Sequence, residues 1–246
     1  MIQLENICKQ YTNHNHTVRA VDNVSFSVAP NERVGIAGGS GSGKSTLLRL
    51  IALLEKPTSG NLWLFGEDVA SIQNYTDIYR SMQMMFQNPL AVIPPRMNIE
   101  AFLLEPYINY GLMDVVAAKD DIRKWMQRVD LPENTVNKYP HEVSGGQLQR
   151  VVLARIMLMN PKLVLFDEPT SALDAVNQKL VLDLLKKIYT EQPFGYVFVS
   201  HDIGLLQAIT DRIIVMKDGQ IVETIESKRL KEAVHPYTQA LVKASV

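Results

Sequence analysis

Gly38-Gly39-Ser40-Gly41-Ser42-Gly43-Lys44-Ser45 is the stretch of sequence that decides the fold of this chain. The apolar positions Val34 and Ile36 precede it, and leucines at helical spacing follow it, which predicts a strand, a glycine loop and a helix in that order. This order matches the phosphate-binding pattern called Walker A. Glycines let successive backbone N–H groups converge on phosphate oxygens, and the following helix adds about half a positive charge at its N-terminus.

The side chains of this loop predict the groups that it binds. Lys44 should reach the β and γ phosphates of a nucleotide, and the Ser45 hydroxyl should bind Mg²⁺. A flexible glycine-serine turn would have a similar composition, but the lysine, the hydroxyl and the flanking elements all agree with a phosphate loop. We expect the nucleotide to be contacted by Gly38, Gly39, Ser40, Gly41, Ser42, Gly43, Lys44, Ser45 and Thr46.

Ser144-Gly145-Gly146-Gln147 indicates which kind of nucleotide protein carries this loop. Together with Leu148-Gln149-Arg150 and the apolar helical run behind it, the segment resembles the signature of ATP-binding cassette (ABC) ATPases, with Val143 where leucine is usual. The segment opens a helix, so it is itself an anion site. In the family, the signature of one subunit caps the ATP held by the phosphate loop of another, which implies a dimer of cassettes.

A second nucleotide motif follows the apolar run Leu163 to Phe166. Such an unbroken run is expected of a parallel strand buried on both faces, and with Asp167 and Glu168 it resembles the Walker B strand of the same family. Asp167 can hold Mg²⁺ through water, while Glu168 points elsewhere on the pleat and can orient the attacking water. A solvated turn is the usual setting of adjacent carboxylates, and the preceding strand and the following Pro169 disfavour it here.

Further positions are assigned by the resemblance alone, which covers nearly the whole chain. Tyr11 matches the aromatic residue that stacks on adenine, although such a ring could equally be ordinary core. Gln87 matches the glutamine that senses Mg²⁺ and nucleotide, and Asp174 ends the loop from Ser171 that crosses the dimer interface. His201 matches the histidine that contacts the γ-phosphate. The implied catalytic residues are Glu168, His201 and Lys44, and the implied Mg²⁺ ligands are Ser45, Gln87 and Asp167.

Periodicity along the chain predicts a mostly parallel core sheet covered on both faces and an inserted helical subdomain. The resemblance to ABC ATPases implies that this is the α/β P-loop NTPase fold of the ABC cassette type, with an antiparallel β-subdomain. Strands are expected at 24–28, 34–36, 62–64, 163–166 and 196–199, at Met82 to Phe86 with its end at Gln87, and in a hairpin of 213–216 with 220–224 around Asp218-Gly219. Helical stripes are expected at Leu47, Leu48, Ile51 and Leu54, at 115–129, at 148–155, and at Val176, Leu180, Leu184 and Ile188.

Prolines at 89, 94, 95 and 106 are expected to break the chain where the helical subdomain begins. We therefore predict a nucleotide-binding core at 1–87 and 161–225. The helical and signature subdomain should span 88–160, and a C-terminal tail should span 226–246. The proline-rich loop 88–96 departs from the family by a second proline in place of a common asparagine, which could alter how the subdomain meets a membrane partner.

The composition of the chain limits the classes of partner and ligand that it can be expected to bind. The 25 basic and 26 acidic residues nearly cancel, so nothing supports a nucleic-acid partner. Cys8 is the single cysteine, which excludes an internal disulfide and suggests a buried, inert thiol. His14 and His16 fit a solvated loop better than a metal site, because no further ligands accompany them.

The location of the protein is predicted from two further features. The N-terminus shows no secretory signal, and apolar stretches such as 151–159 fall short of the roughly 20 residues of a membrane-spanning helix. We therefore expect a peripheral protein at the cytoplasmic face of the cell membrane. Its expected partners are a second ABC ATPase subunit of the same or a paralogous chain, transmembrane permease subunits and, indirectly, an extracellular substrate-binding protein.

The segment His235-Pro236-Tyr237-Thr238-Gln239-Ala240-Leu241 resembles the one that closes the core of ATPases serving dipeptide, oligopeptide and nickel importers. The resemblance implies uptake of peptides, nickel or a metal-chelator complex, and leaves the cargo open. Because the chain ends at Val246, no cysteine-rich extension of that group is expected. Segment 88–143 is too short for the coiled coil of a DNA-repair cassette, and Asn137-Lys138-Tyr139-Pro140 lacks the carboxylate of a GTPase motif. A soluble ABC-type ATPase with a cytosolic assembly partner remains as the alternative.

Overall fold

The computed structural model describes residues 1–13, 16–88, 92–171 and 173–245. The chain folds into two compact units. The first comprises Met1–Gln83, Lys162–Glu168 and Phe194–Val246, and the second comprises Met84–Pro161 and Pro169–Pro193. The chain therefore leaves the first unit twice and returns to it twice, and each unit has its own core.

The phosphate loop follows a central strand of a six-stranded sheet. Its strand order is β10-β9-β3-β8-β7-β6, in which β3 pairs parallel with both β8 and β9, and β7 pairs parallel with β8. Every residue of β7 and β8 is buried, as expected for parallel strands covered on both faces. The strands are β3 (Arg33–Ala37), β6 (Met82–Met85), β7 (Leu163–Asp167), β8 (Gly195–Ser200), β9 (Arg212–Lys217) and β10 (Gln220–Glu226).

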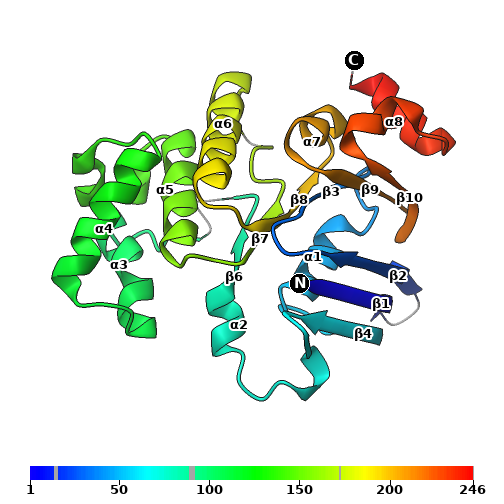
Figure 1. The fold of residues 1–246 in the computed structure, drawn as a ribbon, viewed down its shortest axis with the longest axis horizontal. Coiled ribbons are helices and arrows are strands. Elements are labelled where there is room, and N and C mark those ends of the chain that lie inside the picture. Colours follow the sequence, from blue (N-terminus) through cyan, green and yellow to red (C-terminus); the bar gives the residue numbers. More distant parts are fainter. Residues whose placement is uncertain (14–15, 89–91, 172, 246) are drawn as a thin grey trace. The chain divides into compact units, whose positions relative to one another are not determined.

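A second, antiparallel sheet confirms the predicted β-subdomain. Its strands lie side by side in the order β2-β1-β4-β5 (Figure 1). They are β1 (Ile2–Asn13), β2 (His16–Val28), β4 (Ser59–Leu64) and β5 (Glu67–Asp68). The predicted hairpin of β9 and β10 is also confirmed, since Asp218 and Gly219 have φ angles of 50° and 81° at its tight turn.

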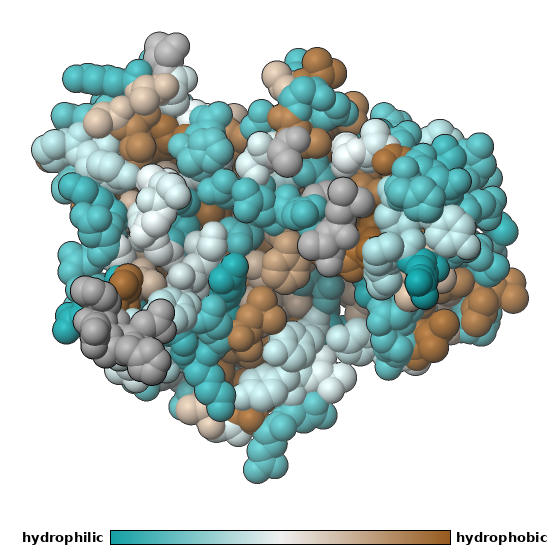
Figure 2. Space-filling model, turned by 180° about the vertical axis from the view of Figure 1, so that it is seen from behind, coloured by the Kyte–Doolittle hydropathy of each residue, from teal (hydrophilic) through white to brown (hydrophobic). Residues whose placement is uncertain are grey.

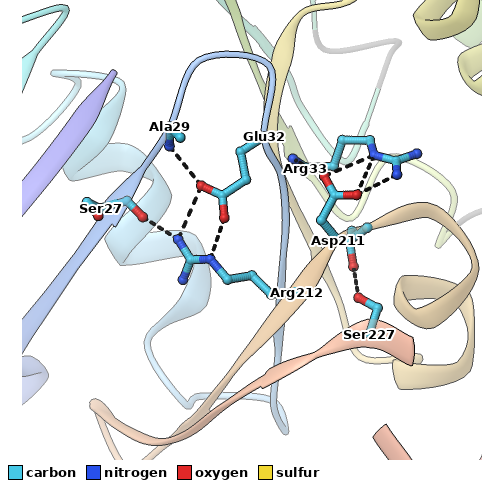
Figure 3. A network of polar contacts seen from close by, with 8 residues as sticks. Ser27, Ala29, Glu32, Arg33, Asp211, Arg212 and Ser227 are labelled. Atoms are coloured by element: carbon cyan, nitrogen blue, oxygen red, sulfur yellow. Dashed lines mark hydrogen bonds and ion pairs between the residues drawn. The ribbon is translucent and has the colours of Figure 1, made fainter. Parts of the chain in front are cut away.

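Two ion pairs fasten the start of β3 to the start of β9. Arg33 Nη2 lies 2.5 Å from Asp211 Oδ1, and Arg212 Nε lies 2.5 Å from Glu32 Oε1 (Figure 3). The backbone N–H of Arg33 also donates to Asp211, over 2.9 Å. These contacts fix the register of the two strands at the end opposite to the phosphate loop.

Short helices complete the first unit. The α-helices are α1 (Lys44–Ile51), α2 (Thr76–Ser81), α7 (Ile203–Ile209) and α8 (Pro236–Ala244), and the 3-10 turns are η1 (Val69–Ser71) and η5 (Ser227–Glu232). Helix α7 packs on β3 and β8, and α8 packs on α7 and η5. The C-terminal segment therefore belongs to this unit.

The second unit is helical. Helices α3, α4 and α5 pack on one another, and α6 packs on α5 (Figure 1). A side-chain acceptor caps the N-terminus of each, from Asn98, Asp114, Ser144 and Asp174 respectively. The elements are α3 (Ile99–Tyr110), α4 (Val115–Arg128), η3 (Glu133–Asn137), η4 (Pro140–Glu142), α5 (Gly145–Leu158) and α6 (Ala175–Glu191).

Pro106 does not break the chain as predicted, but lies inside α3. A proline within a helix leaves the carbonyl four residues earlier without its donor, and here that carbonyl belongs to Phe102. Arg155 of α5 supplies the missing donor, because its Nη1 donates to Phe102 O while its Nη2 pairs with Glu105. A tertiary contact therefore replaces the lost helical hydrogen bond.

Other predictions were wrong at the ends of elements. Strand β6 ends at Met85 rather than Gln87, and Phe86 is 37% exposed. Helix α1 ends at Ile51, short of Leu54, because Leu53 adopts a left-handed φ of 59°. The stripe predicted to begin at Val176 is shifted, since the buried residues of α6 are Val181, Leu184, Leu185 and Ile188.

The surface mixes polar and apolar side chains. Figure 2 shows hydrophilic residues with hydrophobic ones interspersed on the face that it presents. Cys8 is half-buried rather than buried, and its Sγ accepts the backbone N–H of Asn23 over 3.3 Å. His14 lies outside the described residues. Among those that the structure describes, no helix combines the length and apolarity needed to cross a bilayer.

Candidate functional site

The glycine loop lies between β3 and α1 at the carboxyl end of the parallel strands. Gly38, Gly41 and Gly43 all have positive φ angles. A Cβ on Gly38 would lie 2.3 Å from Met216 O, and one on Gly43 would lie 2.1 Å from a backbone oxygen of β2. Backbone therefore surrounds the loop so closely that these two positions admit only glycine.

Lys44 points back over this loop. Its side chain is almost fully buried, and its Nζ donates to the carbonyl oxygens of Gly38 and Gly39, over 2.8 Å each. Burial lowers the pKa of Lys44, while Glu168 and Asp167 act to raise it. An ammonium enclosed by the loop, next to the N-terminus of α1, forms a site that fits the phosphates of a nucleotide.

Ser45 and Asp167 meet although they are far apart in the sequence. Ser45 Oγ donates to Asp167 Oδ1 over 2.8 Å. Burial raises the pKa of Asp167, and the bond from Ser45 acts against that rise. A hydroxyl beside a carboxylate fits Mg²⁺, which usually takes one or two carboxylates and completes its shell with water and substrate phosphate. Among the described residues, no group of three or more His, Cys, Asp or Glu side chains is placed to hold a metal ion.

Glu168 and His201 come together at the ends of neighbouring strands. The backbone N–H of Glu168, which has a φ of 45°, donates to Val199 O of β8 over 3.2 Å. Its Oε2 lies 3.3 Å from Nδ1 of His201, whose side chain is largely exposed. A carboxylate oriented by an imidazole in this way can accept a hydrogen bond from a water molecule.

Tyr11 lies on β1, where its half-exposed ring is held by two neighbours. Its hydroxyl donates to Glu55 Oε2 over 2.5 Å, and Lys9 Nζ lies 5.2 Å from the ring centroid. Burial raises the pKa of Tyr11, and the bond to Glu55 raises it further, while a hydrogen bond from the Thr46 side chain lowers it. The sequence prediction missed Glu55, which carries no motif and follows the end of α1.

The signature segment forms the N-terminus of α5 in the second unit. Ser144 Oγ accepts the backbone N–H of Gln147, and Gln147 Oε1 accepts that of Ser144 over 2.9 Å, so the two residues make a capping box. A Cβ on Gly146 would lie 2.8 Å from Asn177 Oδ1, so a larger residue there would displace the Asn177 side chain. Among the described residues outside its own helical turn, no atom lies within 4 Å of a Cβ placed on Gly145.

The other predicted residues of the second unit are held by local contacts. Gln87 Nε2 donates to Ser171 Oγ over 3.2 Å, and Asp174 accepts the backbone N–H of Asn177 over 2.9 Å. That backbone bond is the main cause of the lowered pKa of Asp174. Ala172 in the predicted interface loop and residues 89–91 of the proline-rich loop lie outside the described residues.

One contact to the phosphate loop was missed by the sequence prediction. Tyr237 of α8 accepts the backbone N–H of Gly39 at its hydroxyl, over 2.7 Å. The segment 235–241 pointed to a group of importers, and nothing in its local pattern pointed to the loop. Only proximity in the fold reveals this pair, which is separated by 198 positions.

Comparison with known proteins agrees with the fold and the phosphate loop. The profile of the ABC transporter family matches residues 21–171, and the chain belongs to that family. It is an ATPase of the ABC type, whose substrate is ATP with Mg²⁺. In particular, it resembles the peptide-importer group of these subunits, as predicted.

Two relatives and one solved structure illustrate the match. A putative peptide import ATP-binding protein of Brucella ovis is 38% identical over 99% of this chain and 78% of its own. The oligopeptide transport ATP-binding protein AppF of Bacillus subtilis is 37% identical over 92% of this chain and 70% of its own. The ATP-binding cassette MJ0796, a dimer in a post-hydrolysis state with ADP and phosphate, superposes with a TM-score of 0.83 at 32% identity. That match covers 92% of this chain and 99% of the cassette.

Proposed function

We propose that this chain is the ATP-hydrolysing subunit of an importer that takes up peptides through partner permeases in the membrane. The observation that carries the proposal is the combination of a complete set of cassette motifs with similarity to peptide-import ATPases along 99% of the chain. Nickel and metal-chelator complexes are the alternative cargoes that the resemblance to this group of importers implies. The two relatives favour peptides, because their names refer to peptide and oligopeptide transport.

The site supports a division of labour in hydrolysis. Lys44 would bind the β and γ phosphates, and Ser45 and Asp167 would hold Mg²⁺, with Gln87 as the further ligand that the family resemblance implies. Bound there, Mg²⁺ neutralises charge that develops on the phosphate oxygens. Glu168 orients the water that attacks the γ-phosphorus, and His201 contacts the γ-phosphate.

Two copies of the cassette are needed in this proposal. Tyr11 stacks on adenine, and the open helix end at Ser144 to Gln147 of a second subunit caps the γ-phosphate, with Asp174 at the interface. The dimeric state of the related cassette MJ0796 supports this arrangement. The second subunit is either an identical or a paralogous chain. Closure on ATP and reopening after hydrolysis would move the permease subunits through the region around Gln87, at the cytoplasmic face of the membrane.

Affinity purification from the native cell tests the transport assignment. Recovery of the chain with polytopic membrane proteins is the expected result, whereas a wholly soluble complex would favour the cytosolic alternative and overturn it. Binding assays on the substrate-binding protein encoded next to this chain test the cargo. Tight binding of oligopeptides is expected, and binding of nickel or a chelated metal instead of peptides would contradict peptide import.

A further inference from the structure

One peptide group of the phosphate loop is held at both of its polar atoms. The carbonyl oxygen of Gly38 and the N–H of Gly39 belong to the same planar unit. Lys44 Nζ donates to that oxygen over 2.8 Å, and that N–H donates to Tyr237 Oη over 2.7 Å. The catalytic lysine and a tyrosine of the C-terminal helix therefore fix the orientation of one peptide plane between them.

The two residues that flank this plane do not restrict its orientation through side chains. It joins two glycines, and Gly38 has a φ of 154°, so no side chain restricts the backbone on either side. A rotation would turn the carbonyl oxygen away from Lys44 and place an N–H group toward the ammonium. Lys44 would then lose one of the two carbonyl acceptors that hold it over the loop.

Tyr237 is itself firmly placed. Glu223 of β10 accepts the backbone N–H groups of Val234 over 2.8 Å and His235 over 3.2 Å, which anchors the entry to α8. His235 Nδ1 accepts the backbone N–H of Tyr237, and Lys217 Nζ lies 5.4 Å from its ring centroid. The hydroxyl is thus presented by a helix that is tied to the same sheet from which the phosphate loop emerges.

We propose that Tyr237 is a positioning residue for ATP binding, which acts by fixing the Gly38–Gly39 peptide and, through it, Lys44. The inference rests on the proposed role of the glycine loop as the ATP site and extends it to the C-terminal segment. Tyr237 touches neither phosphate nor metal in this role. Its effect is to keep the loop in its binding conformation before nucleotide arrives.

Tyr237→Phe removes the hydroxyl and keeps the ring. We expect the Kd of the full chain for a fluorescent ATP analogue to rise about threefold to tenfold, the range of a single hydrogen bond. Exchange of the Gly39 amide with deuterium should accelerate, while the Tm should change by less than about 2 °C. Tyr75→Phe is the matched control, because the Tyr75 hydroxyl bonds Val69 O over 3.5 Å, away from the loop, and should leave the Kd unchanged.

Each outcome of these measurements is decisive. An unchanged Kd in Tyr237→Phe, or an equal rise in Tyr75→Phe, would overturn the role of Tyr237 alone. Failure of the wild-type chain to bind the analogue would overturn the ATP site together with it. If Tyr237→Phe does not fold, amide exchange of the wild-type chain still tests the proposal. The proposal requires the Gly39 amide to exchange more slowly than the Gly41 amide. Equal exchange at both amides would show that the tyrosine does not hold the loop.

Discussion

The Ser45 hydroxyl donates to the carboxylate of Asp167 over 2.8 Å, and this contact joins the two nucleotide motifs of the chain. Ser45 belongs to the helix after the glycine loop and Asp167 to the end of β7. The pair places a hydroxyl and a buried carboxylate where Mg²⁺ would meet the phosphates. The same burial that suits metal binding makes the charged carboxylate unfavourable in the absence of a cation.

Asp167→Asn should therefore separate stability from activity. Burial raises the pKa of Asp167. A carboxyl whose pKa is higher in the folded than in the unfolded chain destabilises the fold as the pH rises above its unfolded pKa, because the unfolded chain ionises first, and the full effect is reached above the folded pKa. Without Mg²⁺ at neutral pH, we expect the variant to melt about 2–4 °C higher, equivalent to about 1 kcal/mol. Its Mg²⁺-dependent ATPase activity should be lost.

Differential scanning fluorimetry and phosphate release check these two effects. Asp183→Asn, at a solvated position of α6, serves as the control and should change neither. A lower Tm for Asp167→Asn in metal-free buffer would show that the buried charge does not destabilise the fold.

Glu168→Gln should abolish hydrolysis while ATP binding is retained. An amide keeps the shape of the side chain but cannot accept a proton or orient water as a carboxylate does, and we expect kcat to fall by about 100-fold or more. ATP should remain bound, and the chain should elute as a closed dimer in size-exclusion chromatography. Glu191→Gln, which removes only an exposed ion pair with Arg128, is the control. Undiminished turnover in Glu168→Gln would refute the assigned role.

Arg155→Met should destabilise the second unit because it leaves Phe102 O, opposite Pro106, without its donor. We expect a loss of about 1.5–3 kcal/mol, typical of a hydrogen bond from a charged group. In a Pro106→Ala background, the restored backbone N–H can bond Phe102 O, and the same substitution should cost about 1 kcal/mol less. Urea denaturation of the four chains of this cycle measures the coupling. Equal costs in both backgrounds would show that Arg155 does not compensate for the proline.

The pair of Arg33 and Asp211 predicts a pH dependence of stability. Burial acts to raise the pKa of Asp211, but hydrogen bonds from the Arg33 side chain and backbone outweigh it, so the pKa is lowered. A carboxyl with a lowered folded pKa stabilises the fold above its unfolded pKa of about 3.9, and this contribution disappears as the pH falls through the folded pKa.

Because the pair is partly exposed, Asp211→Asn should cost only about 0.5–1 kcal/mol at pH 7. The difference from the wild-type chain should shrink toward zero as the pH falls through the lowered folded pKa of Asp211. Thermal melts from pH 7 down to about pH 2 test this dependence. Asp120→Asn, which removes a more exposed pair with Arg123, should show almost no difference at either end. A cost for Asp211→Asn that does not vary with pH would exclude the ionic contribution.

Much of the fold could be predicted because its signals are local. The turn at Asp218 and Gly219 needs two positive φ angles, and the sequence offers the residues that tolerate them. The helix start at Ser144 is encoded by a capping pair three positions apart. The ends of elements were less predictable: Leu54 and Val176 are apolar at the expected spacing, yet packing leaves them exposed.

Parts of the candidate site could be predicted for the same reason, and others could not. The glycine loop and the two carboxylates after β7 are contiguous motifs whose chemistry dictates their spacing. The tether from Glu55 to the Tyr11 hydroxyl belongs to no motif, because it depends on how the chain after α1 passes β1. The roles of the predicted residues in hydrolysis stay predictions until the variants are measured.

The sequence by itself determined the phosphate loop, the strands and helices that flank it and the class of nucleotide chemistry. Each of these depends on residues that are close together in the sequence. Only the tertiary structure decided that Asp167 meets Ser45, that Arg155 replaces the donor missing at Pro106, and that Tyr237 holds the loop at Gly39. The physical reason is the distance along the chain over which each kind of interaction acts. Backbone preferences and side-chain periodicity act over a few residues, whereas these contacts join positions 53 to 198 apart that only the packing of the folded chain brings together.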